Sequence, residues 1–227
     1  MNLWISHKTY SSWSLRPWML LKQLGIDFQE HQVLFGDGPA WDRYRQTVGS
    51  GKVPALNTSD GWLWDSMAIT EWLAERHEGV WPQAPEARAW ARCAAAEMHS
   101  GFQALRQQCA MHTLARFKLH DMNAALCNDL ARVQALWEEG LARFGGPFLA
   151  GDRFTAVDAF FCPVAWRIWA YQLPISAQAQ RYADQLLALP AMQQWQQDAL
   201  REPADPPHEA DCTKAATCVL DLRAGLA

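Results

Sequence analysis

The chain lacks the cysteine patterns of redox and metal proteins. None of its six cysteines forms a CxxC pair or a metal-ligand spacing, and none precedes Cys93. A dithiol oxidoreductase needs a reactive cysteine pair, so this absence argues against that class and we expect no metal site. Four cysteines lie in helical patterns among alanine or other apolar residues, which predicts buried thiols in a reducing compartment.

Long apolar runs and basic runs are also missing. No apolar stretch is long enough to cross a bilayer and no signal-peptide pattern is present, so we expect a cytoplasmic protein with no membrane partner. The formal net charge is −4 at pH 7, which argues against nucleic acid as a partner. Half of the 227 residues are apolar, enough for one large domain or two small ones.

Tryptophan, in contrast, is abundant. The chain has 13 tryptophans, whose large rigid side chains suit a core, a subunit interface or an aromatic pocket. The count leaves all three uses open.

Strand and helix signals alternate over residues 1–79. We predict strands at 2–6, 28–34, 53–57 and 61–64, and helices at 15–24, 41–46 and 66–77. A βαβ unit followed by αββα is typical of a thioredoxin-like α/β domain. A segment with two prolines, 80–85, then reads as a linker.

Strand signals almost vanish after the linker. We predict an all-helical second domain over 86–202, with helices at 87–109, 122–144, 155–171, 176–188 and 190–200. The helix at 155 opens with a capping box, in which Thr155 and Asp158 satisfy each other's backbone amides. The proline-containing tail at 203–227 matches no pattern and receives no structural assignment.

Two short motifs of the first domain suit a peptide-like ligand. Pro54 has no N–H to give to a sheet, and a cis Val53-Pro54 bond would aim the backbone of Val53 outward. Asp65-Ser66 opens an apolar helical pattern, and the amides and hydroxyl at a helix N-terminus bind carboxylates. A plain hairpin that runs into a capped helix is the alternative interpretation.

Val53-Pro54 followed by Asp65-Ser66 at this distance resembles the glutathione site of the glutathione S-transferase family. The resemblance covers about residues 1–200. It implies a thioredoxin-like α/β domain followed by an all-α domain, in a cytoplasmic, homodimeric detoxification enzyme that uses glutathione as co-substrate and no metal. By the same resemblance, Val53 pairs with the cysteinyl backbone of glutathione and Asp65-Ser66 binds its γ-glutamyl end.

The resemblance extends the glutathione-binding set to Trp13, Lys52 and Pro54. Lys52 could pair with the glycyl carboxylate of glutathione, or it could be an ordinary solvated lysine. Trp13 stands where the zeta class of the family has cysteine, which argues against reductase chemistry based on mixed disulfides.

The segment that begins at Tyr10 is similar to the zeta-class pattern Ser-Ser-Cys-Ser-Trp-Arg when the arginine is aligned with Arg16. That alignment implies Ser11 as the catalytic hydroxyl, with its neighbour Ser12 second. Tyr10 is the third candidate, because other classes of the family use a tyrosine that lies nearer the end of the first strand. A hydroxyl that donates to the glutathione thiolate favours the charged form of sulfur, and the positive end of the following helix adds to this. The alternative is that these serines only cap the helix.

The second substrate is expected against the helix at 87–109. We predict an electrophile site formed by Met98, His99, Phe102 and Arg106. His99 and Arg106 lie seven residues apart on one helical face and could position an anion, or they could be solvated packing residues.

The sequence therefore predicts a glutathione S-transferase that uses an N-terminal serine to activate glutathione for attack on a small hydrophobic electrophile. A glutathione-dependent isomerase, of the maleylacetoacetate isomerase kind, or a peroxidase is the alternative enzyme. The zeta class has an arginine where this chain has Ala170, with Arg167 one turn earlier, which weakens the isomerase interpretation. A non-catalytic binding or stress protein of the same fold is the third hypothesis.

Overall fold

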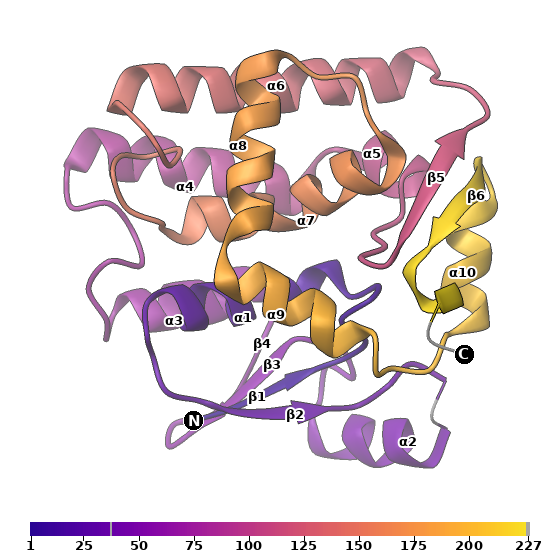
Figure 1. Cartoon of the computed structure of the whole chain (residues 1–227). Coiled ribbons are helices and arrows are strands. Elements are labelled where there is room, and N and C mark those ends of the chain that lie inside the picture. The colour runs from indigo at the N-terminus through magenta and orange to yellow at the C-terminus, as the bar shows by residue number, and fades with distance from the viewer. Residues whose placement is uncertain (37, 226–227) are drawn as a thin grey trace.

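The computed structural model describes residues 1–36 and 38–225 (Figure 1). Its N-terminal part has the predicted thioredoxin-like order. The elements are β1 (Asn2–Ile5), α1 (Ser12–Gln23), β2 (Gln29–Gln32), α2 (Gly38–Thr47), β3 (Ala55–Thr58), β4 (Gly61–Trp64) and α3 (Ser66–Ala74). The four strands form one sheet in the order β2-β1-β3-β4, in which only β1 and β2 pair in parallel.

Helices cover both faces of this sheet. Helices α1 and α3 lie between the sheet and the helical part, and α2 lies on the opposite face (Figure 1). Leu15, Trp18 and Leu21 recur every three residues along α1 and are fully buried, because they form the stripe that faces the core. On the other face, Tyr44 of α2 and Val48 pack in a smaller apolar cluster.

The C-terminal part is mainly helical, as predicted. Its helices are α4 (Pro85–Ser100), α5 (Gln103–Gln108), α6 (Ala124–Phe144), α7 (Ala156–Tyr171), α8 (Ala177–Ala188) and α9 (Pro190–Ala199). Helix α7 is buried along almost its whole length and packs against α1, α4 and α8. The predicted capping box at Thr155 and Asp158 is present and begins this central helix. The expected two-part fold is thus confirmed, and we retain 1–79 and 86–202 as the proposed domain division.

The predicted single helix at 87–109 is wrong, because the chain breaks between α4 and α5. Phe102 has φ 60°, in the left-handed region. A Cβ added at Gly101 would lie 2.8 Å from the carbonyl oxygen of Glu97, so only glycine fits this break without a backbone shift. Apolar periodicity alone did not reveal the break, since both helices continue to bury apolar residues.

The C-terminal tail folds into an extra unit, and the helical part is not free of strands. Its elements are α10 (Pro206–Thr213), β6 (Ala216–Asp221) and the 3₁₀ helix η1 (Leu222–Gly225). Strand β6 pairs antiparallel with β5 (Ala115–Leu119), and the two form a separate ribbon beside α10 (Figure 1). Because β5 pairs with a strand about 100 residues later, its short sequence carries no local hairpin signal. Residues 226–227 of the predicted tail lie outside the described residues.

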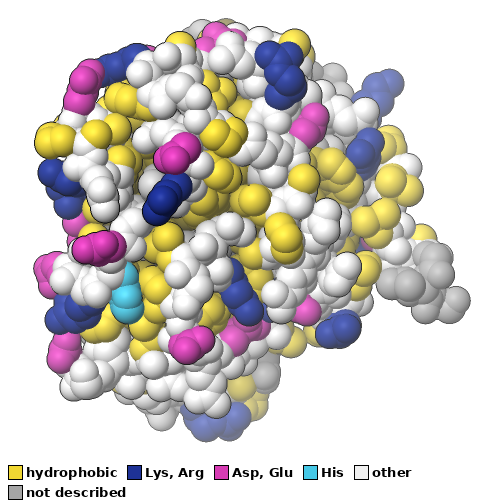
Figure 2. Space-filling view, turned by 60° about the vertical axis from the view of Figure 1, so that its left-hand side comes forward, with side chains coloured by type: hydrophobic (Ala, Val, Ile, Leu, Met, Phe, Trp, Pro, Cys, Tyr) yellow, Lys and Arg dark blue, Asp and Glu magenta, His cyan; other side chains and the backbone are white. Residues whose placement is uncertain are grey.

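The prediction of buried thiols is correct for only half of the cysteines. Cys109, Cys162 and Cys212 are buried, whereas Cys93, Cys127 and Cys218 are exposed. Alanine neighbours misled the prediction, because alanine populates both the buried and the solvent face of a helix. On the face shown in Figure 2, basic and acidic side chains are interspersed with apolar ones, in line with the absence of basic runs in the sequence.

Candidate functional site

A cavity of about 860 Å³ brings together residues from the N-terminal α/β part, the helical part and the C-terminal tail. All of the predicted catalytic serines and glutathione-binding residues line it, together with one residue of the predicted electrophile site. These are Ser11, Ser12, Trp13, Lys52, Val53, Pro54, Asp65, Ser66 and Arg106. Residues from sequence positions more than 50 apart thus converge on one cavity, as a ligand site requires.

The Val53-Pro54 peptide bond is cis, as predicted. The preceding residue, Lys52, is held through its backbone, because Tyr44 Oη donates to its carbonyl oxygen at 2.7 Å. Its side chain is exposed and therefore able to turn toward a ligand at this end of the cavity.

Asp65 and Ser66 begin helix α3 at the cavity. Asp65 Oδ1 accepts from the backbone N–H groups of Met67 at 2.7 Å and Ala68 at 3.4 Å, which caps the helix. Asp65 itself has φ 75°, a conformation that costs energy for a residue other than glycine. Ser66 is fully buried, and its Oγ accepts from Arg16 Nη1 at 3.3 Å. A capped helix N-terminus beside a serine hydroxyl suits a carboxylate.

The predicted serines lie at the start of α1. Ser11 occupies the N-cap position, but its side chain does not cap the helix. Its Oγ instead contacts Ser14 Oγ at 2.7 Å, and Ser14 Oγ also accepts from the backbone N–H of Ser6. The purely capping interpretation therefore fails for Ser11. Ser12 also lines the cavity, where its hydroxyl can meet a ligand.

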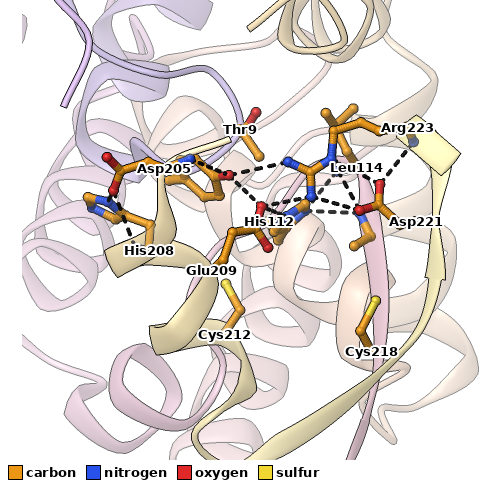
Figure 3. Close-up of polar contacts among 12 residues, drawn as sticks. Thr9, His112, Leu114, Asp205, His208, Glu209, Cys212, Cys218, Asp221 and Arg223 are labelled. Carbon is orange, nitrogen blue, oxygen red and sulfur yellow. Dashed lines mark hydrogen bonds and ion pairs between the residues drawn. The ribbon is translucent and has the colours of Figure 1, made fainter. Parts of the chain in front are cut away.

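The phenol of Tyr10 is already engaged. Tyr10 Oη donates to Glu209 Oε1 at 2.5 Å, and burial followed by this bond raises the pKa of Tyr10. Glu209 also lies 3.3 Å from His112 Nε2 and 2.7 Å from Arg223 Nη2 (Figure 3). Burial acts to raise the pKa of Glu209, but the bonds from His112, Tyr10 and Arg223 outweigh it and lower the pKa to about 2. The Tyr10 proton thus points to a carboxylate of the tail.

His208 of α10 brings the tail into the cavity wall. Its Nδ1 lies 2.5 Å from Asp205 Oδ2 (Figure 3), and its ring stacks on Phe35 at 4.4 Å and on Tyr10 at 5.2 Å. Aromatic side chains from the two ends of the chain therefore form one side of the site.

Three arginines approach the cavity from α1, α5 and α7. Arg16 is enclosed and stacks on Trp13, and burial lowers its pKa. Arg106 and Arg167 line the cavity. Arg106 also stacks on Trp13, with the guanidinium 5.1 Å from the ring centre. Burial lowers the pKa of Arg167 to about 10.

The other predicted electrophile residues do not line the cavity. Met98 is fully buried and Phe102 is nearly so, both within the apolar core. His99 instead connects the first helix and the third, since its Nε2 lies 3.4 Å from Asp65 Oδ2 and its Nδ1 lies 3.5 Å from Arg16 Nη1.

Several lining residues were not predicted. They are Phe35, Trp41, Ser50, Gly51, Trp64, Ala110, Met111, Arg167 and His208. One local signal could have revealed α10, because Asp205 followed by two prolines is a typical helix N-terminus. Nothing local marks His208 as a site residue, because its helix is placed by long-range packing. Arg167 lies one turn before the position that the resemblance indicated, Ala170.

Neither a metal cluster nor a membrane span is evident in the part of the chain that the structure describes. Within residues 1–36 and 38–225, no group of three or more His, Cys, Asp or Glu side chains has the geometry to hold a metal ion. No helix of that part is long and apolar enough to cross a membrane.

Comparison with known proteins points to one family. The sequence model of the glutathione S-transferase N-terminal domain matches residues 10–76. A glutathione S-transferase-like protein, OpS6 of Beauveria bassiana (strain ARSEF 2860), is 26% identical over 160 residues, covering 65% of this chain and 72% of that protein.

Solved structures share the fold. A glutathione transferase homologue from Burkholderia with bound glutathione superposes with a TM-score of 0.65 at 22% identity, covering 87% of this chain and 97% of that one. A maleylacetoacetate isomerase from Methylobacterium extorquens AM1, with bound malonate and glutathione, has a TM-score of 0.63 at 22% identity, with coverages of 89% and 98%.

Proposed function

We propose, since the chain belongs to the glutathione S-transferase family, that it is a glutathione transferase whose cavity holds glutathione beside the Ser11-Ser12 segment. One observation carries this proposal. The Val53-Pro54 segment, the N-terminus of α3 at Ser66 and the N-terminus of α1 line the same cavity. The first offers backbone groups to a peptide, the second binds a carboxylate, and the third is the positive end of a helix, which favours a thiolate. Together they suit a peptide that contains a thiol.

Each charged group of glutathione has a suitable partner. The γ-glutamyl carboxylate suits Ser66 and the amides of α3, and the adjacent ammonium suits the carboxylate of Asp65. The glycyl carboxylate suits Lys52, whose backbone is fixed by Tyr44. Val53 then pairs with the cysteinyl backbone, which places the thiol between these ends.

Ser11 is the first candidate for the hydroxyl that stabilises the thiolate. Its contact with Ser14 can form with either hydroxyl as the donor, because a hydroxyl hydrogen rotates freely. Ser14 Oγ accepts from Ser6 N, so its own proton can go to Ser11 Oγ. The Ser11 proton is then free for the thiolate, whose charged form gains from the bond and from the N-terminus of α1. Ser12 is the second candidate.

The test compares Ser11→Ala and Ser12→Ala with the wild type in conjugation of glutathione to 1-chloro-2,4-dinitrobenzene. We expect replacement of the serine that contacts the sulfur to lower kcat/KM. The same replacement should raise the pKa of the thiol of bound glutathione, which is read from the absorbance of the thiolate. Ser59→Ala, in an exposed turn, is the matched control. If neither site variant changes either quantity, the serine assignment is wrong.

A glutathione-dependent isomerase is the second candidate function. Arg106 and Arg167 in the cavity wall suit the carboxylates of a maleylacetoacetate-like acid. Turnover of such an acid without net consumption of glutathione would support this candidate. Calorimetry that detects no glutathione binding would instead favour a carrier or stress protein.

The assembly and location follow the family in this proposal. We propose a cytoplasmic homodimer that conjugates small electrophiles in detoxification. Sedimentation of the purified chain tests the dimer directly.

A further inference from the structure

The helical part places two guanidinium groups, those of Arg106 and Arg167, in the wall of the cavity. Arg106 lies on α5 and Arg167 on α7, so two packed elements are required to bring them to one site. Neither forms an ion pair within 4 Å among the described residues, although the charge of Asp129 acts on Arg106 from farther away. A buried cation without a paired carboxylate is costly, so a site that keeps two of them suits an anionic ligand.

Hydrogen bonds fix both side chains but leave one donor group on each unused. Arg167 is 4% exposed, and it donates from Nε to the carbonyl of Cys109 at 2.8 Å and from Nη1 to that of Pro163 at 3.2 Å. Its Nη2 has no partner among the described residues, yet it is not enclosed as Arg16 Nη2 is. Arg167 lines the cavity, and Nη2 is its one terminal nitrogen without a partner among the described residues.

Arg106 is held in a similar way. Its Nε donates to the carbonyl of Gly101 at 2.9 Å, its Nη2 donates to that of Met98, and its face stacks on Trp13. Its Nη1 has no partner in the described part of the chain. Guanidinium groups oriented before binding lose little entropy when they bind a carboxylate.

The charges of the cavity do not balance when glutathione alone is bound. Its two carboxylates suit Ser66 and Lys52, its thiolate suits the Ser11 hydroxyl, and its ammonium suits Asp65, the one carboxylate among the described lining residues. Arg167 then has no carboxylate counter-ion among the described residues, and Arg106 has only Asp129, which lies beyond ion-pair distance and does not line the cavity. Both arginines also repel the enclosed cation of Arg16, and a further anion beside them would relieve this repulsion.

We propose that the electrophile of this enzyme carries a carboxylate, which binds between Arg106 Nη1 and Arg167 Nη2. This inference builds on the proposed transferase function and replaces a purely hydrophobic electrophile with an acid that has an apolar body. In a halide displacement, the thiol proton leaves to solvent, the thiolate sulfur forms the bond to carbon, and the halide departs with its bonding pair. The carboxylate of the electrophile remains unchanged and serves only to position the reacting carbon.

The experiment compares two electrophiles with the same leaving group, 1-chloro-2,4-dinitrobenzene and 4-chloro-3,5-dinitrobenzoate. Each kcat/KM is divided by the rate constant of the uncatalysed reaction with glutathione. We expect the wild type to favour the carboxylate-bearing compound by about tenfold or more, the usual size of one charge-assisted hydrogen bond. This comparison needs no variant and is independent of variant folding.

Variants then assign the preference to the two arginines. Arg106→Gln and Arg167→Gln should each reduce the preference, which is the ratio of the two normalised rates and is read in each variant whatever its absolute rate. Arg167→Lys should retain part of the preference, because it keeps the charge. Arg181→Gln, which removes an exposed arginine of α8, is the matched control and should have no effect.

Three outcomes separate the possibilities. No conjugation of either compound, with no glutathione binding, overturns the transferase function itself. Conjugation of both compounds at similar normalised rates would overturn only the proposal that the electrophile carries a carboxylate. An equal loss with both compounds in the variants, accompanied by a raised thiol pKa, would mean that the arginines stabilise the thiolate instead.

Discussion

Tyr10 Oη and Glu209 Oε1 lie 2.5 Å apart, although 199 residues separate them in the chain. This bond connects the loop before α1, which carries the candidate serines, to helix α10 of the tail. Asp205 N and Arg223 Nη1 also donate to Tyr10 Oη, at 3.3 and 3.4 Å. The tail is therefore part of the site wall, and the Tyr10 hydroxyl is occupied before a ligand arrives.

Replacement of Tyr10 by phenylalanine should separate stability from catalysis. Glu209 and the backbone of Asp205 each lose a partner, so we expect the free energy of unfolding to fall by about 1–3 kcal/mol. Conjugation activity at a temperature well below unfolding should remain close to wild type, because the lost proton points to Glu209. Urea denaturation and steady-state kinetics measure the two effects. A loss of activity as large as that of the most affected serine variant would identify Tyr10 as the thiolate donor instead.

Acid should destabilise the tail through Glu209. The pKa of Glu209 falls from an ordinary value of 4.5 to about 2 in the folded protein, although burial alone would raise it. A depressed carboxylate pKa contributes stability above pH 4.5, and this contribution is lost as the pH falls toward 2. The melting temperature should therefore drop over this window by more in the wild type than in Glu209→Gln. Parallel pH profiles for the two proteins would show that Glu209 makes no such contribution.

Gly101→Ala should disturb both the fold and the part of the cavity wall that Arg106 forms. The added Cβ would lie 2.8 Å from the carbonyl oxygen of Glu97, which belongs to the backbone and cannot rotate away. We expect a loss of about 1–3 kcal/mol in the free energy of unfolding, the usual cost of overpacking. Because the Gly101 carbonyl accepts from Arg106 Nε, the preference for a carboxylate-bearing electrophile should also decrease. Gly49→Ala, where an added Cβ meets nothing within 4 Å, is the control.

The first 79 residues were predictable because their signals are local. Pro54 and the Asp65-Ser66 helix start depend on covalent geometry and on capping by neighbouring residues, and the structure contains both a cis bond and a capped helix there. The capping box at Thr155 was visible for the same reason, since its two partners lie three residues apart.

Signals that depend on distant partners were missed. Strand β5 exists because β6 pairs with it, and the helix break at Phe102 is a left-handed conformation that periodicity does not report. The assignment of Met98 and Phe102 to the electrophile site followed from one uninterrupted helix. The break leaves both side chains in the core and leaves Arg106 in the cavity.

The sequence by itself determined the two-part architecture, the Val53-Pro54 turn and the helix start at Asp65-Ser66, since helix caps, proline geometry and apolar periodicity act over a few residues. Only the tertiary structure decided what completes the cavity. Packing of α7 against α1 positions Arg167 in the cavity wall. The bonds of Glu209 hold α10 in place, and α10 positions His208 in the same wall. Long-range burial and charge pairing have no fixed spacing along the chain, so they emerge only when the segments meet.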